Sequence, residues 1–421
     1  MSVSVAAIRS KVQGFRVRTP FLRVAALAAP PVLAALVVAP FSVRFEGFWP
    51  WDPRVVDLEV YRYTGQVLLE GGDILTARTP RDGLAFIYPP FAALLCVPLV
   101  VIPLVALKAL WLAATAIVLF AVLYRLGLTG WPLSLVTTGC VFFVEPVRET
   151  IGFGQVNVFL MAMVVLDLVP GPRLSGLLVG RRLLPAGVLT GIAAAIKLTP
   201  ALFAVYLLVA RQWRTARWVV LSAGAATLLG LVALPRESIA FWQILLSGDT
   251  RTGYTSFLFN QSILSAVLRF LGETGSAHRL GLILSACVAL VGAWAAALWH
   301  RRGHVLFAVS LCGVATLLAS PLSWTHHFVW VVPLAFAIRN RVLPPLVRGL
   351  ATAFVLWVSA AVFKQMPWGQ GVELTYAFGD KLVAAVTPML GVALVVAAAV
   401  TTPRRSTSRT TRPRLETPAV Q

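Results

Sequence analysis

The chain has 421 residues, of which 58% are hydrophobic and only 12% are charged, and its mean hydropathy is +0.84. A soluble domain carries roughly 25% charged residues, so this composition excludes an ordinary soluble protein and predicts an integral membrane protein. The net charge of +20 does not indicate nucleic-acid binding, because Lys and Arg lie between apolar runs instead of in one stripe. The four cysteines are scattered through apolar segments and predict neither a metal site nor a disulfide framework.

The first apolar segment, residues 21–41, follows a basic arm at residues 1–20. It is long enough to cross a ~30 Å hydrocarbon core. It contains Pro30 and Pro31 and lacks a small-residue cleavage site, so we expect a persistent anchor instead of a removed signal peptide. Cytoplasmic connections are enriched in Lys and Arg, and the arm is therefore expected to be cytoplasmic.

Residues 88–103 carry four prolines between Pro89 and Pro103. Each proline lacks a backbone donor and restricts the residue before it. We predict a short interfacial or re-entrant element here, because a full span would place Arg125 outside and invert every later basic connection. The predicted spans are residues 21–41, 105–124, 131–146, 156–171, 184–198, 199–211, 218–234, 280–299, 304–320, 327–339, 349–364 and 381–401.

These spans predict an all-α polytopic membrane protein with about twelve transmembrane helices and both ends in the cytoplasm. One transmembrane domain covers residues 21–401, and residues 402–421 form a disordered basic cytoplasmic tail. The pair at residues 184–211 is short, which suggests a tight hairpin that does not reach the full outer interface. The outer connections are residues 42–87, 147–154, 235–279, 320–326 and 365–380. All acidic residues except Asp167 and Glu416 lie on or beside this face, which is where we expect the chemistry.

Asp57 lies in the first outer loop, soon after a span. A carboxylate with an ordinary pKa near ~4 is ionised at neutral pH and can accept a proton from a hydroxyl group, so Asp57 is a candidate general base. The alternative is an acid that faces lipid headgroups or caps a helix. Glu59 follows two residues later and would point away from Asp57 on a helix.

Three later motifs add polar groups at outer helix ends. Tyr88 begins the proline-rich segment, which forms either a rigid helix start or a binding groove. Gln155 and Asn157 open a span, and their amides either cap a helix or bind sugar hydroxyl groups. Lys197 follows an apolar run at a depth where a lysine costs about 2.5–3.5 kcal/mol unless it is paired, so we expect an anionic partner such as a lipid phosphate; snorkelling is the alternative.

The turn at residues 320–327 places His326 and His327 beside Trp324. Successive helical residues diverge by about 100°, so the two imidazoles are not expected to share one metal, but one of them could donate a hydrogen bond or a proton to a phosphate. The long loop at residues 235–279 adds Asn260, Gln261 and Arg251, whose planar fork suits phosphate. No nucleotide-binding or metal-type motif is present, so an activated substrate should be a lipid-phosphate carrier.

Six motifs in this order resemble the actinobacterial polyprenol-phosphate-mannose-dependent alpha-(1,2)-mannosyltransferases of the glycosyltransferase C superfamily. The likeness covers roughly residues 50–335. The motifs are Asp57-Leu58-Glu59-Val60-Tyr61, Tyr88-Pro89-Pro90, Gly154-Gln155-Val156-Asn157, Lys197-Leu198-Thr199-Pro200, Asn260-Gln261-Ser262 and Ser323-Trp324-Thr325-His326-His327.

The resemblance implies a glycosyltransferase C fold with a periplasmic first loop and juxtamembrane helices in the bacterial plasma membrane. It implies an inverting transfer in which Asp57 deprotonates an acceptor hydroxyl while polyprenyl phosphate departs from the sugar. Candidates for binding the donor phosphate are Lys197, His326, His327 and Arg251. Candidates for contact with the sugar or acceptor are Glu59, Tyr61, Tyr88, Gln155, Asn157, Asn260, Gln261 and Trp324.

The expected donor is polyprenyl-phosphate mannose, the expected acceptor is a glycolipid or lipoglycan, and no cofactor or nucleic acid is expected. Divalent metal dependence stays open. Two alternatives remain at this point: a polyprenyl-phosphate arabinofuranose-dependent transferase on a similar scaffold, and a transporter or flippase for a lipid-linked saccharide. Transporters often show repeated halves, and no internal repeat is visible in this sequence.

Overall fold

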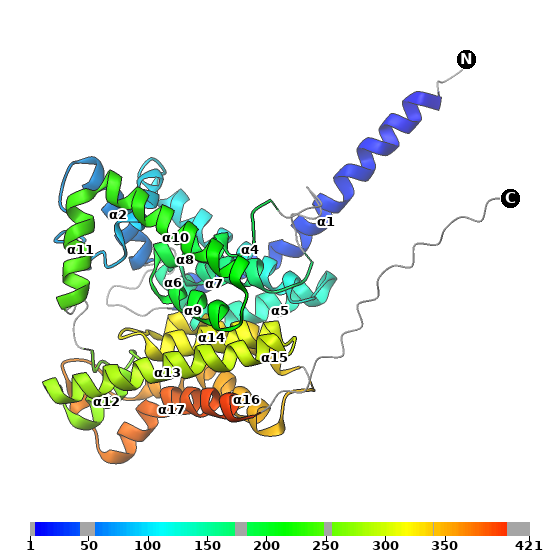
Figure 1. Ribbon diagram of the computed structural model, residues 1–421. Helices are drawn as coiled ribbons and strands as arrows, with labels where there is room; N and C mark the ends of the chain where they lie inside the picture. Colours follow the sequence, from blue (N-terminus) through cyan, green and yellow to red (C-terminus); the bar gives the residue numbers. More distant parts are fainter. Residues whose placement is uncertain (1–4, 43–54, 173–182, 248–254, 340, 402–421) are drawn as a thin grey trace.

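The computed structural model describes residues 5–42, 55–172, 183–247, 255–339 and 341–401. This part of the chain is almost entirely helical (Figure 1). It contains no β-strand, and only two isolated bridges occur, Arg78 with Ala85 and Asn260 with Trp324. The predicted all-α class is confirmed.

The helices form two groups that follow the sequence, one in blue to green and one in yellow to red (Figure 1). The first group is α1 (Val5–Ser42), α2 (Val56–Leu69), α3 (Pro90–Cys96), η1 (Val97–Leu99), α4 (Leu104–Arg125), α5 (Gly130–Phe143), α6 (Glu145–Phe153), α7 (Asn157–Leu168), α8 (Val188–Ile196), η3 (Thr199–Ala201), α9 (Leu202–Val209), α10 (Trp213–Ala233) and α11 (Pro235–Ser247). The second is α12 (Ile263–Leu271), α13 (Gly275–Arg301), α14 (Val305–Ala319), η4 (Thr325–Trp330), α15 (Val331–Ile338), α16 (Pro345–Ala360), η5 (Val362–Gln365), η6 (Val372–Leu374) and α17 (Phe378–Val400). The groups meet where α6 and α7 pack on η4 and where α9 packs on α13 and α14.

Within the described residues, six helical stretches are long and apolar enough to cross a membrane, or seven if the bent pair α5 and α6 is one span. The six are Leu22–Phe41, Leu104–Arg125, Trp213–Ala233, Gly275–Arg301, Pro345–Gln365 and Phe378–Val400. Large apolar side chains remain exposed on them, such as Val232 at 73% and Leu290 at 64%. Exposed apolar surface on several long helices is expected where the helices contact lipid. The chain is therefore a multi-pass membrane protein.

The remaining predicted spans coincide with shorter apolar helices, among them α7, α14 and the η4–α15 pair. The proline-rich residues 88–103 form α3 and η1, which have seven and three residues and are too short to cross a bilayer. Helix α3 starts where Pro90 occupies its first turn, a position where the missing backbone donor costs nothing. The short element predicted there is present.

Residues 147–154, expected as an outer loop, instead belong largely to helix α6, which is bent by 76° from α5. The bend occurs because Val144 adopts an extended conformation and Pro146 enters the first turn of the new helix. Gly154 ends α6 in the left-handed conformation. Although this segment is rich in polar residues, it forms a helix, and most of its residues are buried.

The pair α8 and α9 forms a shallow hairpin. Gly187 and Gly191 lie against Thr215 and Val219 of α10, and Ala195 shares a small buried cluster with Ala226. Because α10 continues for seven more residues to Ala233, the turn after α8 lies about 10 Å short of that end of α10 at 1.5 Å per residue. This agrees with the hairpin expected from the short apolar runs.

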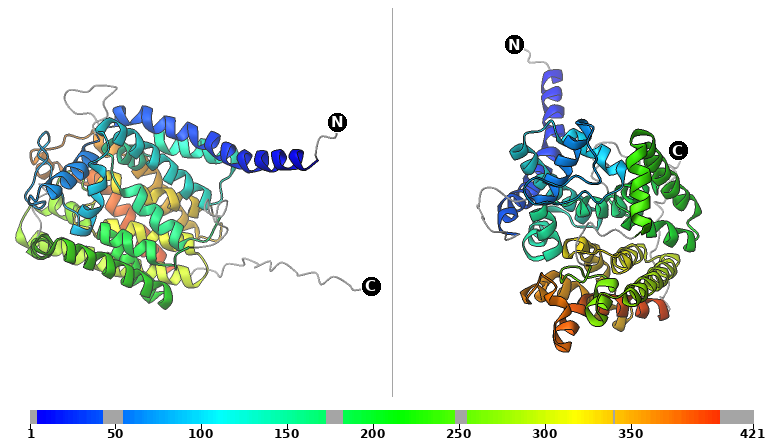
Figure 2. Two further views of the ribbon diagram at one scale, coloured as in Figure 1. Left: turned by 90° about the horizontal axis from the view of Figure 1, so that it is seen from above. Right: turned by 90° about the vertical axis from the view of Figure 1, so that its left-hand side faces the viewer.

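Figure 2 (left) shows that the start of α1 and the end of α17 lie at the same end of the molecule, whereas α2 lies at the opposite end. This arrangement requires an even number of crossings if both helices span the membrane.

Candidate active site

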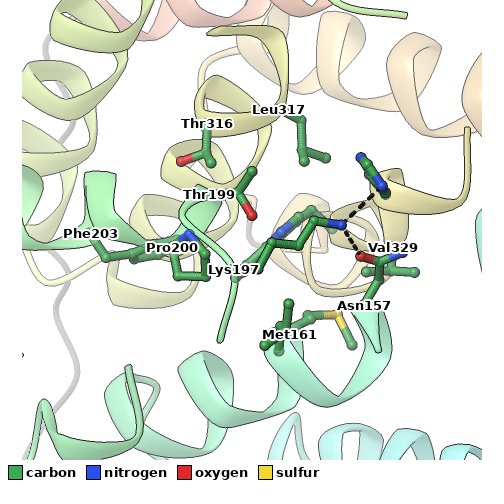
Figure 3. A pocket seen from close by; sticks show the side chains of 12 residues that line it. Asn157, Met161, Lys197, Thr199, Pro200, Phe203, Thr316, Leu317 and Val329 are labelled. Carbon is green, nitrogen blue, oxygen red and sulfur yellow. Dashed lines mark hydrogen bonds between the residues drawn. The ribbon is translucent and has the colours of Figure 1, made fainter. Parts of the chain in front are cut away.

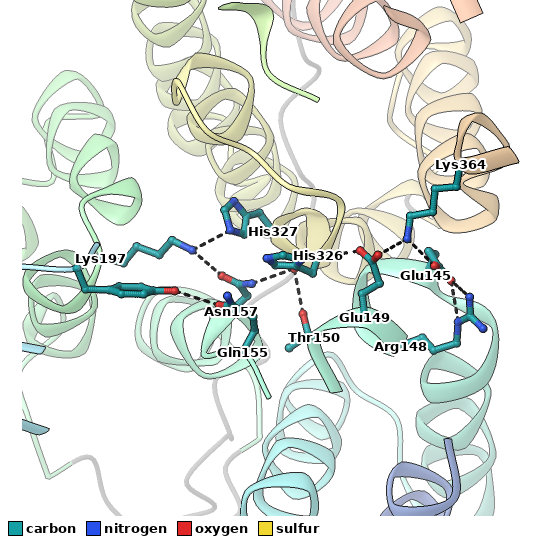
Figure 4. Close-up of polar contacts among 11 residues, drawn as sticks. Glu145, Arg148, Glu149, Thr150, Gln155, Asn157, Lys197, His326, His327 and Lys364 are labelled. Atoms are coloured by element: carbon teal, nitrogen blue, oxygen red, sulfur yellow. Dashed lines mark hydrogen bonds and ion pairs between the residues drawn. The ribbon is translucent and has the colours of Figure 1, made fainter. Parts of the chain in front are cut away.

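Most of the predicted site residues converge at the seam between the two helix groups. Figure 4 shows five of them: Gln155, Asn157, Lys197, His326 and His327. The converging residues come from α2, from the segment just before α3, from the junction of α6 and α7, from the turn after α8 and from η4. The side chains brought together are Asp57, Tyr61, Tyr88, Gln155, Asn157, Lys197, His326 and His327.

The first turn of α2 fits against the end of α6 only because residue 154 is glycine. Gly154 has φ +70°, and a Cβ atom there would lie 2.8 Å from the Cβ of Leu58 and 3.0 Å from the Cβ of Val55. Such distances are shorter than carbon atoms tolerate. The glycine therefore allows Gln155 to lie directly beside Asp57.

Gln155 connects the carboxylate to two tyrosines. Its Oε1 atom accepts hydrogen bonds from the hydroxyl groups of Tyr61 and Tyr88, each at 3.1 Å, and these hydroxyl groups are 3.1 Å apart. With Oε1 occupied, the amide nitrogen is free to donate to Asp57. The tyrosines thereby fix the orientation of the amide that holds the carboxylate.

Burial raises the pKa of Asp57 from 3.8 to about 6, although the hydrogen bond from Gln155 and the charge of Lys197 act in the opposite direction. A carboxyl with this pKa still ionises at neutral pH but is a stronger base than an ordinary aspartate. The pKa values of Tyr61 and Tyr88 are raised by burial, so both remain protonated donors.

Lys197 interrupts the α8–α9 hairpin. Its backbone is extended, and its Nζ donates to Oδ1 of Asn157 at 3.1 Å and to Nε2 of His327 at 3.0 Å (Figure 4). The ammonium group also lies 5.4 Å from the centre of the Tyr88 ring. A lysine has no acceptor, so Nε2 of His327 must be the acceptor and the ring is neutral, with its proton on Nδ1.

A cavity of about 20 Å³, roughly the space of one water molecule, lies beside this lysine (Figure 3). Its polar lining comes from Asn157, Lys197, Thr199, Thr316 and His327. The cavity is too small for a sugar, so a substrate must bind outside this cavity or displace side chains.

The turn that carries the histidines is held by its backbone. Thr150 and Asn157 both donate to the main-chain carbonyl of His326, at 2.9 Å and 3.1 Å. The imidazole of His326 packs at a steep angle on His327, with ring centres 4.7 Å apart. Its Nδ1 lies 3.9 Å from Oε2 of Glu149, and its Nε2 is buried without a hydrogen-bond partner among the described residues.

Sequence reasoning missed a buried charge cluster behind His326 (Figure 4). Lys364 pairs with Glu149 and lies 2.7 Å from Glu145, which in turn accepts a hydrogen bond from Arg148 at 2.7 Å. The sequence did contain a signal for this cluster: Glu145 and Glu149 are four residues apart between apolar segments. Residues at this spacing share one helix face, and acids at membrane depth need charged partners.

Three of the predicted contact residues have other partners in the structure. Glu59 forms an ion pair with Lys108 at 3.1 Å and joins α2 to α4. The amide of Asn260 is used by backbone groups of its own loop and of Pro321 and Ser323. Gln261 donates to the carbonyl of Leu258 at 2.6 Å. These contacts give each of them a structural role.

Trp324 forms an isolated bridge with Asn260 and packs on Phe257. Arg251, predicted to bind phosphate, lies outside the described residues. Among the described His, Cys, Asp and Glu side chains, no group of three is arranged to hold a metal ion.

The family description of glycosyltransferase family 87 matches residues 86–321, more than half of the chain. The chain belongs to glycosyltransferase family 87. The matched region includes Tyr88, Gln155, Asn157 and Lys197, whereas Asp57 and the histidines lie outside it. The predicted glycosyltransferase identity is confirmed.

Curated relatives of this family 87 enzyme come from mycobacteria. The Mycobacterium tuberculosis polyprenol-phosphate-mannose-dependent alpha-(1-2)-phosphatidylinositol pentamannoside mannosyltransferase is 35% identical over 332 residues, 74% of this chain and 73% of the relative. A second M. tuberculosis protein, the corresponding phosphatidylinositol mannoside mannosyltransferase, is 29% identical over 73% of this chain and 74% of the relative. The pentamannoside enzyme of Mycolicibacterium smegmatis is 32% identical over 81% of this chain and 82% of the relative. No solved structure matches the chain.

Proposed function

We propose that this family 87 glycosyltransferase transfers mannose from polyprenol-phosphate-mannose to a hydroxyl group of a phosphatidylinositol mannoside and forms an alpha-(1-2) linkage. The names of its relatives give this donor and acceptor class. The observation that carries the proposal is that Asp57 lies close enough to Lys197 for the lysine charge to lower the pKa of the carboxyl group. Lys197 itself contacts His327. A base and a cationic group on one site are what transfer from a lipid phosphate requires.

The reaction is an inverting displacement at the anomeric carbon. The acceptor oxygen forms a bond to that carbon while the bond to the phosphate oxygen breaks, and the proton of the acceptor hydroxyl passes to Asp57. Negative charge develops on the departing polyprenyl phosphate. Lys197 faces this charge, and the loss of its proton is not needed, since electrostatic stabilisation alone lowers the barrier.

The two histidines have different parts in this scheme. His327 accepts a hydrogen bond from Lys197 and orients the ammonium group. The Nε2 atom of His326 is buried, has no hydrogen-bond partner in the described part of the chain and can donate to a phosphate oxygen, while Glu149 lies beside the other ring nitrogen. His326 is therefore the stronger candidate for direct phosphate contact.

The proposed topology has about twelve crossings, both chain ends in the cytoplasm and the site facing the periplasm of a bacterial plasma membrane. Residues 1–20 and 402–421 would be cytoplasmic, and residues 42–87 and 235–279 would form the periplasmic loops of the domain at 21–401. Cysteine labelling in a cysteine-free background tests this. Glu70→Cys should react with an impermeant reagent from outside, and Arg302→Cys should react only after permeabilisation; the reverse pattern would overturn the orientation.

The functional test is a donor-swap assay with purified enzyme in lipid. Polyprenyl-phosphate mannose and polyprenyl-phosphate arabinofuranose are supplied separately with phosphatidylinositol mannosides of different length, and labelled glycolipid is measured. Transfer from mannose alone, lost in Asp57→Asn, supports the proposal. Transfer from arabinofuranose alone would replace the donor, and movement of labelled lipid between leaflets without elongation would replace the reaction with transport.

We expect no organic cofactor in this reaction. Metal dependence is measured in the same assay by adding a chelator and then restoring Mg²⁺ or Mn²⁺.

A further inference from the structure

Four aromatic side chains form a cluster beside the histidine turn: Phe257, Phe259, Trp324 and Trp368. The ring centres of Phe257 lie 5.7 Å from Trp324 and 5.8 Å from Trp368, and Phe259 lies 5.2 Å from Trp368. The contacts of Phe257 are edge-to-face, with interplanar angles of 72° and 83°. The rings therefore form an angled cluster, which we call the aromatic cup, instead of a flat stack.

This aromatic cup is open to its surroundings. Trp368 is 56% exposed, and the other three rings are partly exposed. The ammonium group of Lys364 lies 5.5 Å from the centre of the Phe259 ring. A charged group at its edge distinguishes the cup from the apolar stripes that face lipid.

The loops that form the cup are cross-linked by a buried carboxylate. Oε1 of Glu373, which is 1% exposed, accepts from the backbone of Leu258 at 3.2 Å and of Gly369 at 2.8 Å. Arg269, which is fully buried, donates to the carbonyl groups of Phe257 and Asn260 at 3.3 Å and 3.0 Å. Burying charged groups is costly, and here they hold exposed rings in place.

The cup adjoins the reaction centre through two connections. Trp324 precedes His326 by two residues in the same turn. Lys364, at the edge of the cup, pairs with Glu149, which lies 3.9 Å from the His326 imidazole. A molecule resting on the cup would thus lie next to the proposed phosphate site.

We propose that this aromatic cup is the platform on which the glycan of the acceptor stacks, and that it takes a hexopyranose residue through its apolar C–H face. The inference rests on the proposed transfer reaction and adds the place where its acceptor binds. The face of an aromatic ring carries partial negative charge and attracts the weakly positive C–H groups on one side of a pyranose. Fixed rings lose little conformational freedom on binding.

An alternative role for an exposed tryptophan is anchoring at the membrane interface. The two roles differ in which kinetic constant they change. Stacking on the acceptor glycan changes the KM of the acceptor alone, whereas an interfacial anchor positions the whole domain in the membrane and changes the KM of the donor as well. Measuring both constants in Trp368→Tyr, Trp368→Leu and Trp368→Ala therefore separates them.

The experiment measures initial rates with phosphatidylinositol mannoside as the varied acceptor and polyprenyl-phosphate mannose saturating. We expect Trp368→Ala and Trp368→Leu to raise the acceptor KM by roughly five- to tenfold, while Trp368→Tyr stays within about twofold of wild type. The donor KM and the slow hydrolysis of donor without acceptor should be unchanged in all three. Trp131→Ala is the matched control, because Trp131 is 63% exposed on α5.

A donor KM that rises together with the acceptor KM, or an equal loss in Trp131→Ala, would show an interfacial anchor and overturn the platform. An unchanged KM in Trp368→Ala would overturn it as well. Failure of the wild-type enzyme to transfer mannose would instead refute the proposed reaction, which separates the two inferences.

Discussion

Replacing Asp57 by Asn tests the role of the carboxylate and the effect of its burial at once. The variant keeps the shape of the side chain and an oxygen that can accept from Gln155, but it cannot take up a proton. General base catalysis contributes about 10²- to 10⁴-fold, so we expect mannosyl transfer to fall by at least about 100-fold. Glu70→Gln, at the exposed end of α2, removes a carboxylate from the same helix and should leave transfer unchanged.

The same substitution should stabilise the protein. A pKa raised from 3.8 to about 6 means that the buried charge of Asp57 costs about 3 kcal/mol at pH 7, where both the folded and unfolded forms are ionised. Well below pH 3.8 both forms are protonated and the cost vanishes. The stability of the wild-type protein relative to Asp57→Asn should therefore decrease as the pH rises from about 4 to above 6.

Thermal unfolding in one detergent at pH 4.5, 5.5 and 7.5 measures this difference. The rate at limiting acceptor should rise with pH and level off above about 6, as the base form of Asp57 accumulates. A variant with more than a tenth of wild-type transfer would refute the catalytic role. A melting-temperature difference that does not change with pH would refute the argument from burial.

Three further substitutions test the scaffold of the site. Gly154→Ala should lower both stability and transfer, because it combines backbone strain with a steric clash. Gly127→Ala, at φ +97° with open space around it, should cost only about 1–2 kcal/mol and keep activity. Equal losses of stability in thermal unfolding would contradict this. Lys364→Met should destabilise by about 3–5 kcal/mol because it leaves the buried carboxylate of Glu149 without its lysine partner, whereas Glu145 keeps Arg148. Adding Glu149→Gln should restore part of the melting temperature, and no recovery would show that the pair is not coupled. Asn260→Ala should lower the melting temperature because it removes hydrogen bonds to several backbone groups. A loss of transfer without a loss of stability would instead indicate that Asn260 contacts the substrate.

The sequence was sufficient to locate most of the long apolar helices and to name several residues that the structure brings together. Apolar run length and charge asymmetry are local properties, so predicted spans such as residues 105–124 and 381–401 coincide with α4 and α17 within a few residues. The motifs around Asp57, Gln155 and Lys197 pointed to one site because polar groups are rare at membrane depth. The glycosyltransferase identity followed from their order along the chain.

The sequence could not reveal which polar groups pair with one another. Glu145 and Lys364 are separated by 219 residues, and only the seam between the two helix groups brings them together behind His326. The same packing assigns Glu59 to Lys108 and commits the Asn260 amide to backbone groups. Sequence determined that this chain crosses a membrane and carries a carboxylate and a lysine at its helix ends. The tertiary structure decided which of these groups face a common site, because buried polar groups must find partners wherever the packed helices place them.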